Sequence, residues 1–406
     1  MNTFFNIGII TTSRSEFGVL KDLIFHISNL SKLTLFVGGS HLIDKSSYQE
    51  IKEFTDSLSI NVINLNSNKF DNDLRPSNQM INIGKMGESL SVYLEDLKID
   101  LLIIIGDRWE LFSASISALL CRVPIAHISG GEITREAIDE NIRHSITKMA
   151  HLHFVACEKY AENISCMGEE DWRIVISGEI GLDWIHNNPI IEFRKTISKL
   201  KIPFSEKFIL FTYHPISYGD FNLLEKEVNE IKNAFKSLKD FTILITGPGY
   251  EIGSEYVRLE FENLAKNKQN IYYQEHLGRD NYLSLMNGAL LVLGNSSSGI
   301  FEAPSLKIKT INIGLRQNGR ERANSTIDIK CDSNEIIKNV KKYSLKMSKE
   351  KKEKIINPYD PFMDGKNSLR VAKACINALS TKRRNKLLTK NFSKNIEKEL
   401  WNKMLN

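Results

Sequence analysis

Short apolar runs, rich in β-branched and aromatic residues, alternate along this chain with longer stretches of mixed polarity. The runs have the length of buried strands, and the stretches between them are long enough for helices. This alternation is typical of βαβ units and predicts parallel sheets with helices packed on them. One group of predicted strands comprises residues 4–10, 33–37, 101–105, 125–128, 153–156 and 174–176. A second group comprises residues 208–212, 241–246, 271–273, 290–293 and 310–313.

The two groups of strands predict two domains. A chain of 406 residues also exceeds the size at which one hydrophobic core usually keeps growing. Residues 178–203, between the groups, contain two glycines and two prolines, which favour loops and place the boundary there. We therefore expect an α/β protein with two Rossmann-like, doubly wound domains over residues 1–185 and 186–365. Residues 366–406 would form a terminal helix and a basic tail.

The composition narrows the class of protein. Hydrophobic residues make up 42% of the chain and charged residues 25%, as in soluble globular proteins. No apolar run approaches the roughly 18 residues of a membrane span, and the first residues resemble a strand more than a signal peptide. The five cysteines form no CxxC pair. That pattern indicates reduced thiols in the cytoplasm, with neither a disulfide framework nor a zinc site.

Positive charge is concentrated near the end of the chain. The net charge is +5, but residues 382–403 hold eight Lys and Arg against two Glu, so the remainder is nearly neutral. A basic tail can contact nucleic acid or an anionic membrane, but a solvated helix face is the commoner explanation and the one expected here. We therefore predict neither a nucleic-acid partner nor a membrane partner.

Polar residues gather directly after several predicted strands. In doubly wound sheets, ligands bind beyond the carboxyl ends of the strands, so these positions carry the most weight. Strand 101–105 is followed by GDRWE, strand 125–128 ends in HISGGEIT, and strand 208–212 is followed by a His-Pro pair. The candidates at such places are Arg14, Asp107, Arg108, Glu132, Asp139 near the start of a helix, and His214.

Residues 290–305, LLVLGNSSSGIFEAPS, run from an apolar strand through a Ser/Gly turn into a predicted helix that opens near Ile300. Such a turn presents hydroxyls and backbone N–H groups to an anion, which also meets the positive end of the helix dipole. Gly299 would let the backbone approach a ligand closely. The candidates in the turn are Ser296, Ser297 and Ser298, and RQNGRER, beginning at Arg316, offers three guanidinium groups that could clamp a diphosphate.

Each cluster also has an ordinary structural explanation. Asp107 and Arg108 could pair with each other or cap a helix, and Asp139 and Arg143 could form a surface ion pair. The histidines at 127, 144, 151 and 153 could be satisfied core or surface residues, and no Cys or carboxylate lies at ligand spacing, so no metal site is predicted. All the clusters together are explained by one ligand, a negatively charged nucleotide derivative bound between the domains.

Several motifs then carry a family resemblance. The chain resembles the hydrolysing UDP-N-acetylglucosamine 2-epimerases of the bacterial sialic acid and legionaminic acid pathways over about residues 5–376. The motifs, in order, are GDRWE, HISGGEIT, AIDENIRHSITKMAHLHF, the His214-Pro215 pair, EHLGRDNYLSLMNGA, GNSSSGIFEAPS and NIGLRQNGRERA. The resemblance implies a GT-B-like fold with the active site in the cleft, a homodimer, and no metal or redox cofactor.

The resemblance also implies a reaction and roles for residues. UDP is eliminated from UDP-GlcNAc to leave a 2-acetamidoglucal, and water then adds to give free ManNAc. The UDP phosphates or uracil would be bound by Arg14, Arg108, Ser296, Ser297 and Arg316, with Ser298 in the same turn. Glu302 would bind the ribose, His276 would lie near the uridine, and His214 would act at the diphosphate and sugar as a proton donor or an anchor. Asp107 and Asp139 match the essential aspartates of the family.

The sequence departs from the family pattern in two places. Many relatives have Glu where Ser129 stands, and a serine cannot replace it as an acid. The chemistry would then use Asp107 and Asp139, or Glu132 would contribute, and the sequence leaves the C2 base open. Gly249 and Glu251 stand where relatives commonly have an Asn-x-Asp pair, so one sugar or uridine contact is altered.

Other functions stay open at this point. A UDP-sugar glycosyltransferase of the same fold would release UDP only with an acceptor, and a non-hydrolysing epimerase would keep UDP on its product. A UDP-sugar-binding regulator without catalysis is a further alternative, suggested by Ser129. The sequence does not distinguish UDP-GlcNAc from UDP-N,N′-diacetylbacillosamine as substrate.

Overall fold

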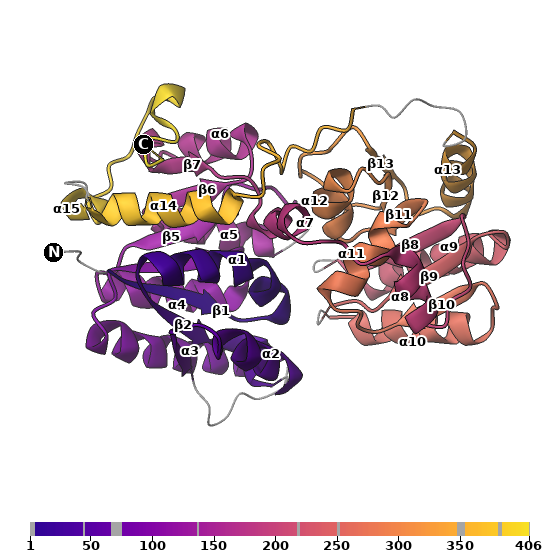
Figure 1. Ribbon diagram of the computed structural model, residues 1–406, viewed down its shortest axis with the longest axis horizontal. Helices are drawn as coiled ribbons and strands as arrows, with labels where there is room; N and C mark the ends of the chain where they lie inside the picture. Colours follow the sequence, from indigo (N-terminus) through magenta and orange to yellow (C-terminus); the bar gives the residue numbers. More distant parts are fainter. Residues whose placement is uncertain are drawn as a thin grey trace. The chain divides into compact units, whose positions relative to one another are not determined.

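The computed structural model describes residues 5–43, 45–65, 75–135, 138–216, 220–249, 252–346, 354–380 and 384–405 (Figure 1). The chain divides into two compact units. The first consists of Met1–Glu132, Asp139–Trp184 and Tyr359–Asn406, and the second of Ile133–Ile138 and Ile185–Pro358. The end of the chain therefore belongs to the first unit. In the described residues, no helix is both long and apolar enough to cross a membrane.

The first unit is built on a seven-stranded parallel sheet with strand order β3-β2-β1-β4-β5-β6-β7. Its strands are β1 (Asn6–Thr11), β2 (Lys32–Val37), β3 (Asn61–Asn64), β4 (Leu101–Ile105), β5 (Ile125–Ile128), β6 (Leu152–Val155) and β7 (Ile174–Ile176). Its helices are α1 (Arg14–Leu30), α2 (Lys45–Thr55), α3 (Pro76–Asp96), α4 (Trp109–Leu120), α5 (Asp139–Met149), α6 (Glu158–Cys166), α14 (Asn367–Ser380) and α15 (Arg384–Leu387), with α7 (Asp183–Asn187) beginning at its boundary.

The second unit has a six-stranded parallel sheet with strand order β10-β9-β8-β11-β12-β13. Its strands are β8 (Phe208–Thr212), β9 (Thr242–Thr246), β10 (Ile271–Gln274), β11 (Leu291–Gly294), β12 (Thr310–Ile313) and β13 (Thr326–Ile329). Its helices are α8 (Phe193–Lys199), α9 (Phe221–Ser237), α10 (Ser254–Lys266), α11 (Arg279–Asn287), α12 (Ser298–Ser305) and α13 (Ser333–Lys346). The predicted fold class, two doubly wound α/β sheets, is confirmed.

Burial on both faces explains why the central strands are continuously apolar. In β4, Leu101, Ile103 and Ile105 join one core cluster of the first unit. The alternate residues, Leu102 and Ile104, join another. Successive side chains of a strand point to opposite faces, so a strand with helices on both sides needs an apolar residue at every position.

Every predicted strand is present, but β3 and β13 were not predicted. Their sequences, NVIN and TIDI, place polar residues within four-residue strands. Both lie at an edge of their sheet, where one face is less covered and a polar side chain reaches solvent. The apolar signal used to find the other strands is therefore weak in them.

The predicted terminal helix is confirmed as α14, which packs against α1 in the first unit. Its first turn is capped by the buried Asp183 carboxylate. Oδ1 accepts from the Asn367 N–H at 2.8 Å, and Oδ2 accepts from the Ser368 N–H at 2.6 Å. Donors that would be orphaned at a helix N-terminus are thereby paired with a negative charge.

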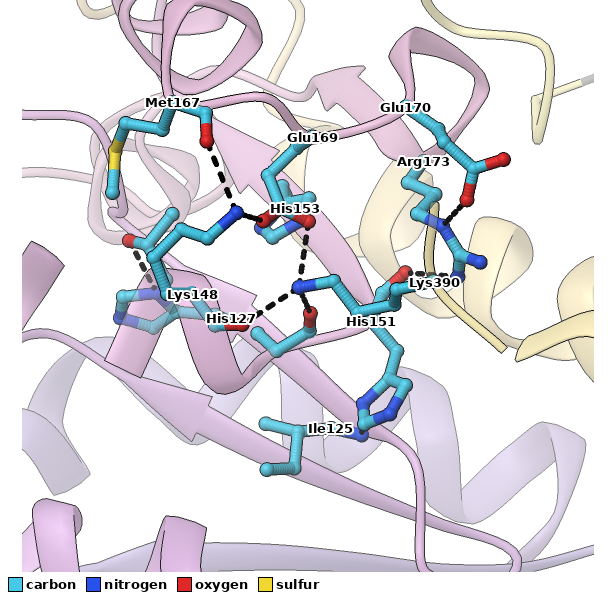
Figure 2. Close-up of polar contacts among 12 residues, drawn as sticks. Ile125, His127, Lys148, His151, His153, Met167, Glu169, Glu170, Arg173 and Lys390 are labelled. Carbon is cyan, nitrogen blue, oxygen red and sulfur yellow. Dashed lines mark hydrogen bonds and ion pairs between the residues drawn. The ribbon is translucent and has the colours of Figure 1, made fainter. Parts of the chain in front are cut away.

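The basic tail is largely solvated, as its composition suggested, with Lys386, Lys394, Lys398 and Lys403 exposed, but it is not one helix face and it is attached to the first unit. The fully buried Arg173 guanidinium donates to the backbone carbonyls of Leu387, Lys386 and Thr389 at 3.0, 3.1 and 2.7 Å. Figure 2 shows this region, in which Lys390 Nζ reaches the buried Glu169 carboxylate at 2.7 Å. Lys390 also donates to the carbonyls of Lys148 and Ala150, both at 2.7 Å. The tail is thus packed on the first unit through buried charge.

The attachment of the tail can be tested by replacing Arg173. In Arg173→Met, three tail carbonyls lose their donor and Glu170 loses its partner, so we expect a loss of about 3 kcal/mol in unfolding free energy. Urea unfolding followed by tryptophan fluorescence measures it. Lys159→Met is the control, because Lys159 is exposed and its described ion pair, to Glu162 at 3.6 Å, lies at the surface, where such pairs add little stability. Equal midpoints for both variants would contradict the role of Arg173.

His151 makes stability depend on pH. Its Nδ1 accepts from the Ile125 N–H at 3.1 Å, so the ring is neutral there. Burial, with Lys390 and Arg173 nearby, lowers the pKa of His151 to about 3. In the unfolded chain, His151 binds a proton below its ordinary pKa of about 6.5, whereas in the folded chain it stays neutral until about pH 3. The folded state is therefore destabilised as the pH falls from about 6.5 toward 3.

The effect is tested by comparing how steeply the unfolding free energy of wild type and of a His151 variant changes with pH. His151→Gln keeps an acceptor but does not titrate, so between pH 6 and 4 its unfolding free energy should fall less steeply than that of wild type, by up to about 1.4 kcal/mol per pH unit. Urea unfolding at several pH values gives both slopes. Identical slopes would show that His151 titrates normally in the folded protein.

Candidate active site

In the first unit, the strand order reverses between β1 and β4. The loops after these strands therefore turn to opposite faces of the sheet, and the crevice between them is where such sheets bind ligands. Arg108 follows β4 at this point. Its Nη2 donates to Glu110 Oε1 at 2.8 Å, and its Nε lies 3.8 Å from Glu16 Oε1. About a third of the Arg108 side chain remains exposed, so a cation is oriented at the sheet edge by two carboxylates.

Glu16 supports this cation from the start of α1. Its carboxylate accepts from the Thr12 and Ser13 N–H groups at 2.6 and 3.2 Å, and Ser13 caps the helix in return. Burial raises the pKa of Glu16 to about 7, while Arg108 and the backbone donors act in the opposite direction. Arg14, by contrast, bonds Glu50 of α2 through Nε at 3.0 Å. Arg14 and Arg108 therefore belong to different ion-pair groups.

Arg143 links the segments that carry the predicted catalytic carboxylates. Its side chain is 1% exposed and forms an ion pair with Asp107, the residue before Arg108. Its Nη1 donates to the Glu132 carbonyl at 2.9 Å and to Glu140 Oε2 at 3.3 Å. One guanidinium thus joins the loop after β4, the loop after β5 and helix α5, whose first residue is Asp139.

Arg143 was not among the site residues that the sequence predicted. An ordinary surface pair with Asp139 was one explanation considered for it, and that explanation is wrong, because Arg143 is almost fully buried. Its only sequence signal is a position four residues after Asp139, on the same face of a helix. That spacing predicts neither the burial of Arg143 nor its bond to Asp107. Asp107 is paired with Arg143, and Arg108 with Glu110, while the charges of Asp107 and Arg108 also attract each other.

The buried histidines of this sheet have structural roles. His127 Nε2 lies 2.8 Å from the Gly106 carbonyl and Nδ1 lies 3.2 Å from Thr147 Oγ1, which supports the loop carrying Asp107. Burial lowers the pKa of His127 to about 4, so its ring is neutral at pH 7. Among the described residues, no group of three or more His, Cys, Asp or Glu side chains is arranged to hold a metal ion.

In the second unit, the strand order reverses between β8 and β11, and two residues join the loops at this point. The His214 N–H donates to Asn295 Oδ1 at 2.7 Å, and Asn295 Nδ2 donates to the His214 carbonyl at 2.8 Å. The Asn295 carbonyl in turn accepts from Arg316 Nη1 at 3.3 Å and from Gln317 Nε2 at 2.8 Å. His214 and Arg316 are thereby brought to the turn that follows β11.

The protonation state of His214 follows from its contacts. Its Nδ1 accepts from the Gly249 N–H at 3.1 Å, which assigns the ring proton to Nε2. Burial, together with Arg316, lowers the pKa of His214 well below its ordinary value. The imidazole is therefore neutral and offers an N–H donor. Gly249, which stands with Glu251 where relatives commonly have an Asn-x-Asp pair, supplies this contact, while Glu251 lies outside the described residues.

The serine turn leads into α12, which begins at Ser298, two residues before the predicted start. Ser298 Oγ lies 2.6 Å from the Tyr282 hydroxyl and 3.1 Å from Ser296 Oγ, and Ser297 is the N-cap residue. Gly299 has a packing role that was not foreseen, because a Cβ there would lie 2.8 Å from Thr310 Cγ2. The glycine lets α12 approach β12.

The remaining candidates of the second unit lie at different distances from the turn. Glu302 is in α12 one helical turn after Ser298, and burial raises its pKa, opposed by Arg279. His276 is exposed and follows β10, an edge strand two places from β8 in the sheet. Of the three guanidinium groups in RQNGRER, Arg322 pairs with Asp328 and Arg320 lies over the Phe301 ring. Arg316 alone among them has a described bond to Asn295.

Two Rossmann-like units, each built on a parallel sheet, define a GT-B-like protein. In each unit, polar groups gather where the strand order of the sheet reverses. The sequence model of the family described as UDP-N-acetylglucosamine 2-epimerase matches residues 26–376. The chain therefore belongs to this family and is an enzyme of the epimerase class.

Two curated relatives illustrate the similarity. The GDP/UDP-N,N′-diacetylbacillosamine 2-epimerase (hydrolyzing) of Campylobacter jejuni is 34% identical over 328 residues, covering 79% of this chain and 83% of the relative. The UDP-N,N′-diacetylbacillosamine 2-epimerase (hydrolyzing) of Legionella pneumophila is 28% identical, covering 79% and 84%.

Solved structures share the fold. UDP-GlcNAc 2-epimerase from Neisseria meningitidis, bound to UDP-GlcNAc, has a TM-score of 0.69 at 18% identity and covers 92% of this chain and 100% of its own. UDP-N-acetylglucosamine 2-epimerase from Rickettsia bellii has a TM-score of 0.72 at 17% identity, with coverages of 93% and 99%.

Replacing Arg143 tests whether it orients Asp107. Arg143→Lys keeps a positive charge but lacks the planar fork whose two nitrogens bond Asp107 and the Glu132 carbonyl, so Asp107 should lose its fixed position. We expect kcat for a UDP-N-acetylhexosamine to fall about 10- to 100-fold with KM changed less than about two-fold. Steady-state assays measure both. Arg122→Lys, at an exposed Arg in the same unit, is the control, and equal kcat values in the two variants would rule the role out.

Proposed function

We propose that this protein is a hydrolysing 2-epimerase that converts a UDP-linked 2-acetamido sugar and water to UDP and the free manno-configured sugar. The observation that carries the proposal is the buried Arg143 guanidinium, which forms an ion pair with Asp107 and donates to the Glu132 carbonyl. These contacts join the loops after β4 and β5 at the carboxyl edge of the first sheet. The names of the Campylobacter and Legionella relatives, both hydrolysing enzymes, support the proposal.

The first step is elimination of UDP, in which a base removes the C2 proton as the C1–O bond breaks. Asp107 is the proposed base, because its ion pair with Arg143 favours the carboxylate form. Asp139, at the start of α5, and Glu132 are the proposed second acid and base groups. The glycal formed then takes up a proton at C2 and water at C1.

Departure of UDP needs help, because the C2 proton is not acidified by a carbonyl group. Negative charge develops on the diphosphate, and donors aimed at it lower the barrier. In the second unit, these donors are the N-terminus of α12 with Ser296, Ser297 and Ser298, the Arg316 guanidinium and the neutral Nε2–H of His214. Arg14, Arg108, His276 and Glu302 are proposed to contact the remaining phosphate, uracil or ribose groups.

Two substrates are proposed for parallel assay. The names of the Campylobacter and Legionella relatives point to UDP-N,N′-diacetylbacillosamine, and the Campylobacter name includes a GDP form. A UDP-N-acetylglucosamine 2-epimerase of Neisseria meningitidis, 28% identical, supports UDP-GlcNAc. A cytoplasmic homodimer stays a prediction from the family resemblance.

Incubation of the purified protein with each UDP-sugar in D₂O tests the proposal. We expect UDP release without an acceptor, a free manno-configured N-acetyl sugar, and one deuterium at C2, all visible by ³¹P and ¹H NMR. Asp107→Asn should lower the rate by about 100-fold or more, since a base is lost. UDP release only with an acceptor would indicate a glycosyltransferase, UDP retained on the product a non-hydrolysing epimerase, and binding without turnover a regulator.

A further inference from the structure

Ser129, the first residue after β5, has an unusual backbone conformation. Its φ is +63°, in the left-handed region, and Gly131 two residues later has φ +75°. A glycine adopts this region without strain, whereas a residue with a Cβ does not, so such outliers often coincide with functional positions. What the serine adds over glycine is a hydroxyl. That hydroxyl is used: Ser129 Oγ donates to Glu179 Oε2 at 3.3 Å.

Glu179 lies in the loop after β7 and is fixed there by several hydrogen bonds. Its side chain is almost buried, with the residue 8% exposed, and its Oε1 accepts from the Gly181 N–H at 3.4 Å. Its backbone N–H donates to the Tyr359 carbonyl at 2.8 Å, and its carbonyl accepts from Asn367 Nδ2 at 3.0 Å. The carboxylate is therefore aimed at Ser129 by contacts on both sides of it, and it has little freedom to turn elsewhere.

The Ser129–Glu179 pair lies on the same sheet edge as Asp107. β5 is the neighbour of β4, and the Gly106 N–H donates to the Ile128 carbonyl at 3.0 Å, so the two strand-end loops run side by side. Because the hydroxyl proton of Ser129 is directed to Glu179, the lone pairs of its oxygen are left to accept a proton from another molecule. A hydroxyl placed between a fixed carboxylate and a reacting water is the arrangement of a proton relay.

We propose that Ser129 and Glu179 form the proton relay for the hydration half of the reaction, an inference that rests on the proposed function. Water attacks C1 of the glycal, and its proton passes to Ser129 Oγ while the hydroxyl proton of Ser129 passes to Glu179. The electron pair of the C1=C2 bond takes a solvent-derived proton at C2 from the second acid group, Asp139 or Glu132, on the face opposite to the one from which Asp107 removed the first proton. Glu179 then returns its proton to solvent. Ser129 is the catalytic residue, and Glu179 is a positioning residue that acts through it.

The relay predicts that the two half-reactions separate. In Glu179→Gln, elimination continues, so UDP release should stay within about three-fold of wild type. Formation of the free sugar should fall at least ten-fold, and the 2-acetamidoglucal should accumulate with its vinyl proton visible by ¹H NMR. Ser129→Ala should behave in the same way. Glu158→Gln, at an exposed carboxylate of α6, is the matched control and should release UDP and sugar at wild-type rates.

Moving the carboxylate from position 179 to position 129 should restore formation of the free sugar. In the double variant S129E/E179Q, the carboxylate stands directly at position 129, and free-sugar formation should recover at least ten-fold over Glu179→Gln. Serine already carries a Cβ there, so the added atoms introduce no new backbone restriction. A structural role for Glu179 predicts instead that UDP release and sugar formation fall together and that the double variant stays impaired.

The outcomes separate this inference from the proposed function. If wild type releases no UDP from either UDP-sugar, the proposed function is wrong and the relay has no reaction to serve. If wild type is active but both variants lose the two half-reactions in parallel, or lose neither, the relay alone is overturned. Should Glu179→Gln fail to fold, the Ser129→Ala variant decides, because it changes a single oxygen atom.

Discussion

In both units, every strand of the sheet runs in the same direction, so each strand delivers the loop that follows it to one shared edge. All the polar groups of the candidate site depend on this constraint. In the first unit it places Asp107 after β4 beside the loop after β5, and in the second it places His214 after β8 beside Asn295 after β11. The helices that follow begin at the same edge and add their N-terminal N–H groups, which suits an anionic ligand.

Two buried arginines of the first unit, Arg143 and Arg173, illustrate one constraint on buried charge. A guanidinium buried away from water must have its donors paired, and removing a partner leaves an uncompensated charge. Arg143 is paired by the Asp107 carboxylate and the Glu132 carbonyl, so its burial orders the proposed catalytic loops. Arg173 is paired by Glu170 and by carbonyls of the C-terminal segment. One buried arginine thus orders the loops of the proposed site, and the other attaches the end of the chain.

The protonation states in the two units suit the proposed chemistry. Asp107 is paired with a buried cation, which favours the carboxylate, the form that can accept a proton. His214 is kept neutral by burial and by Arg316, and its contact to Gly249 leaves the Nε2 proton to be donated. A neutral donor and a nearby guanidinium can stabilise charge developing on a diphosphate without the desolvation cost of a second buried cation.

Local sequence was sufficient for most of the strands, for the division into two sheets and for the polar residues after the strands. The run LLIII of β4 and the GNSSSG turn can each be recognised within a few residues, because an apolar run and a Ser/Gly turn are local sequence patterns. The short edge strands β3 and β13 lack that apolar signal. The partners of charged side chains were decided only by the tertiary structure: Arg143 meets Asp107 across 36 positions, Ser129 meets Glu179 across 50, and Arg173 meets Thr389 across 216. Burial makes each of these pairings necessary, and burial is a property of how the whole unit packs.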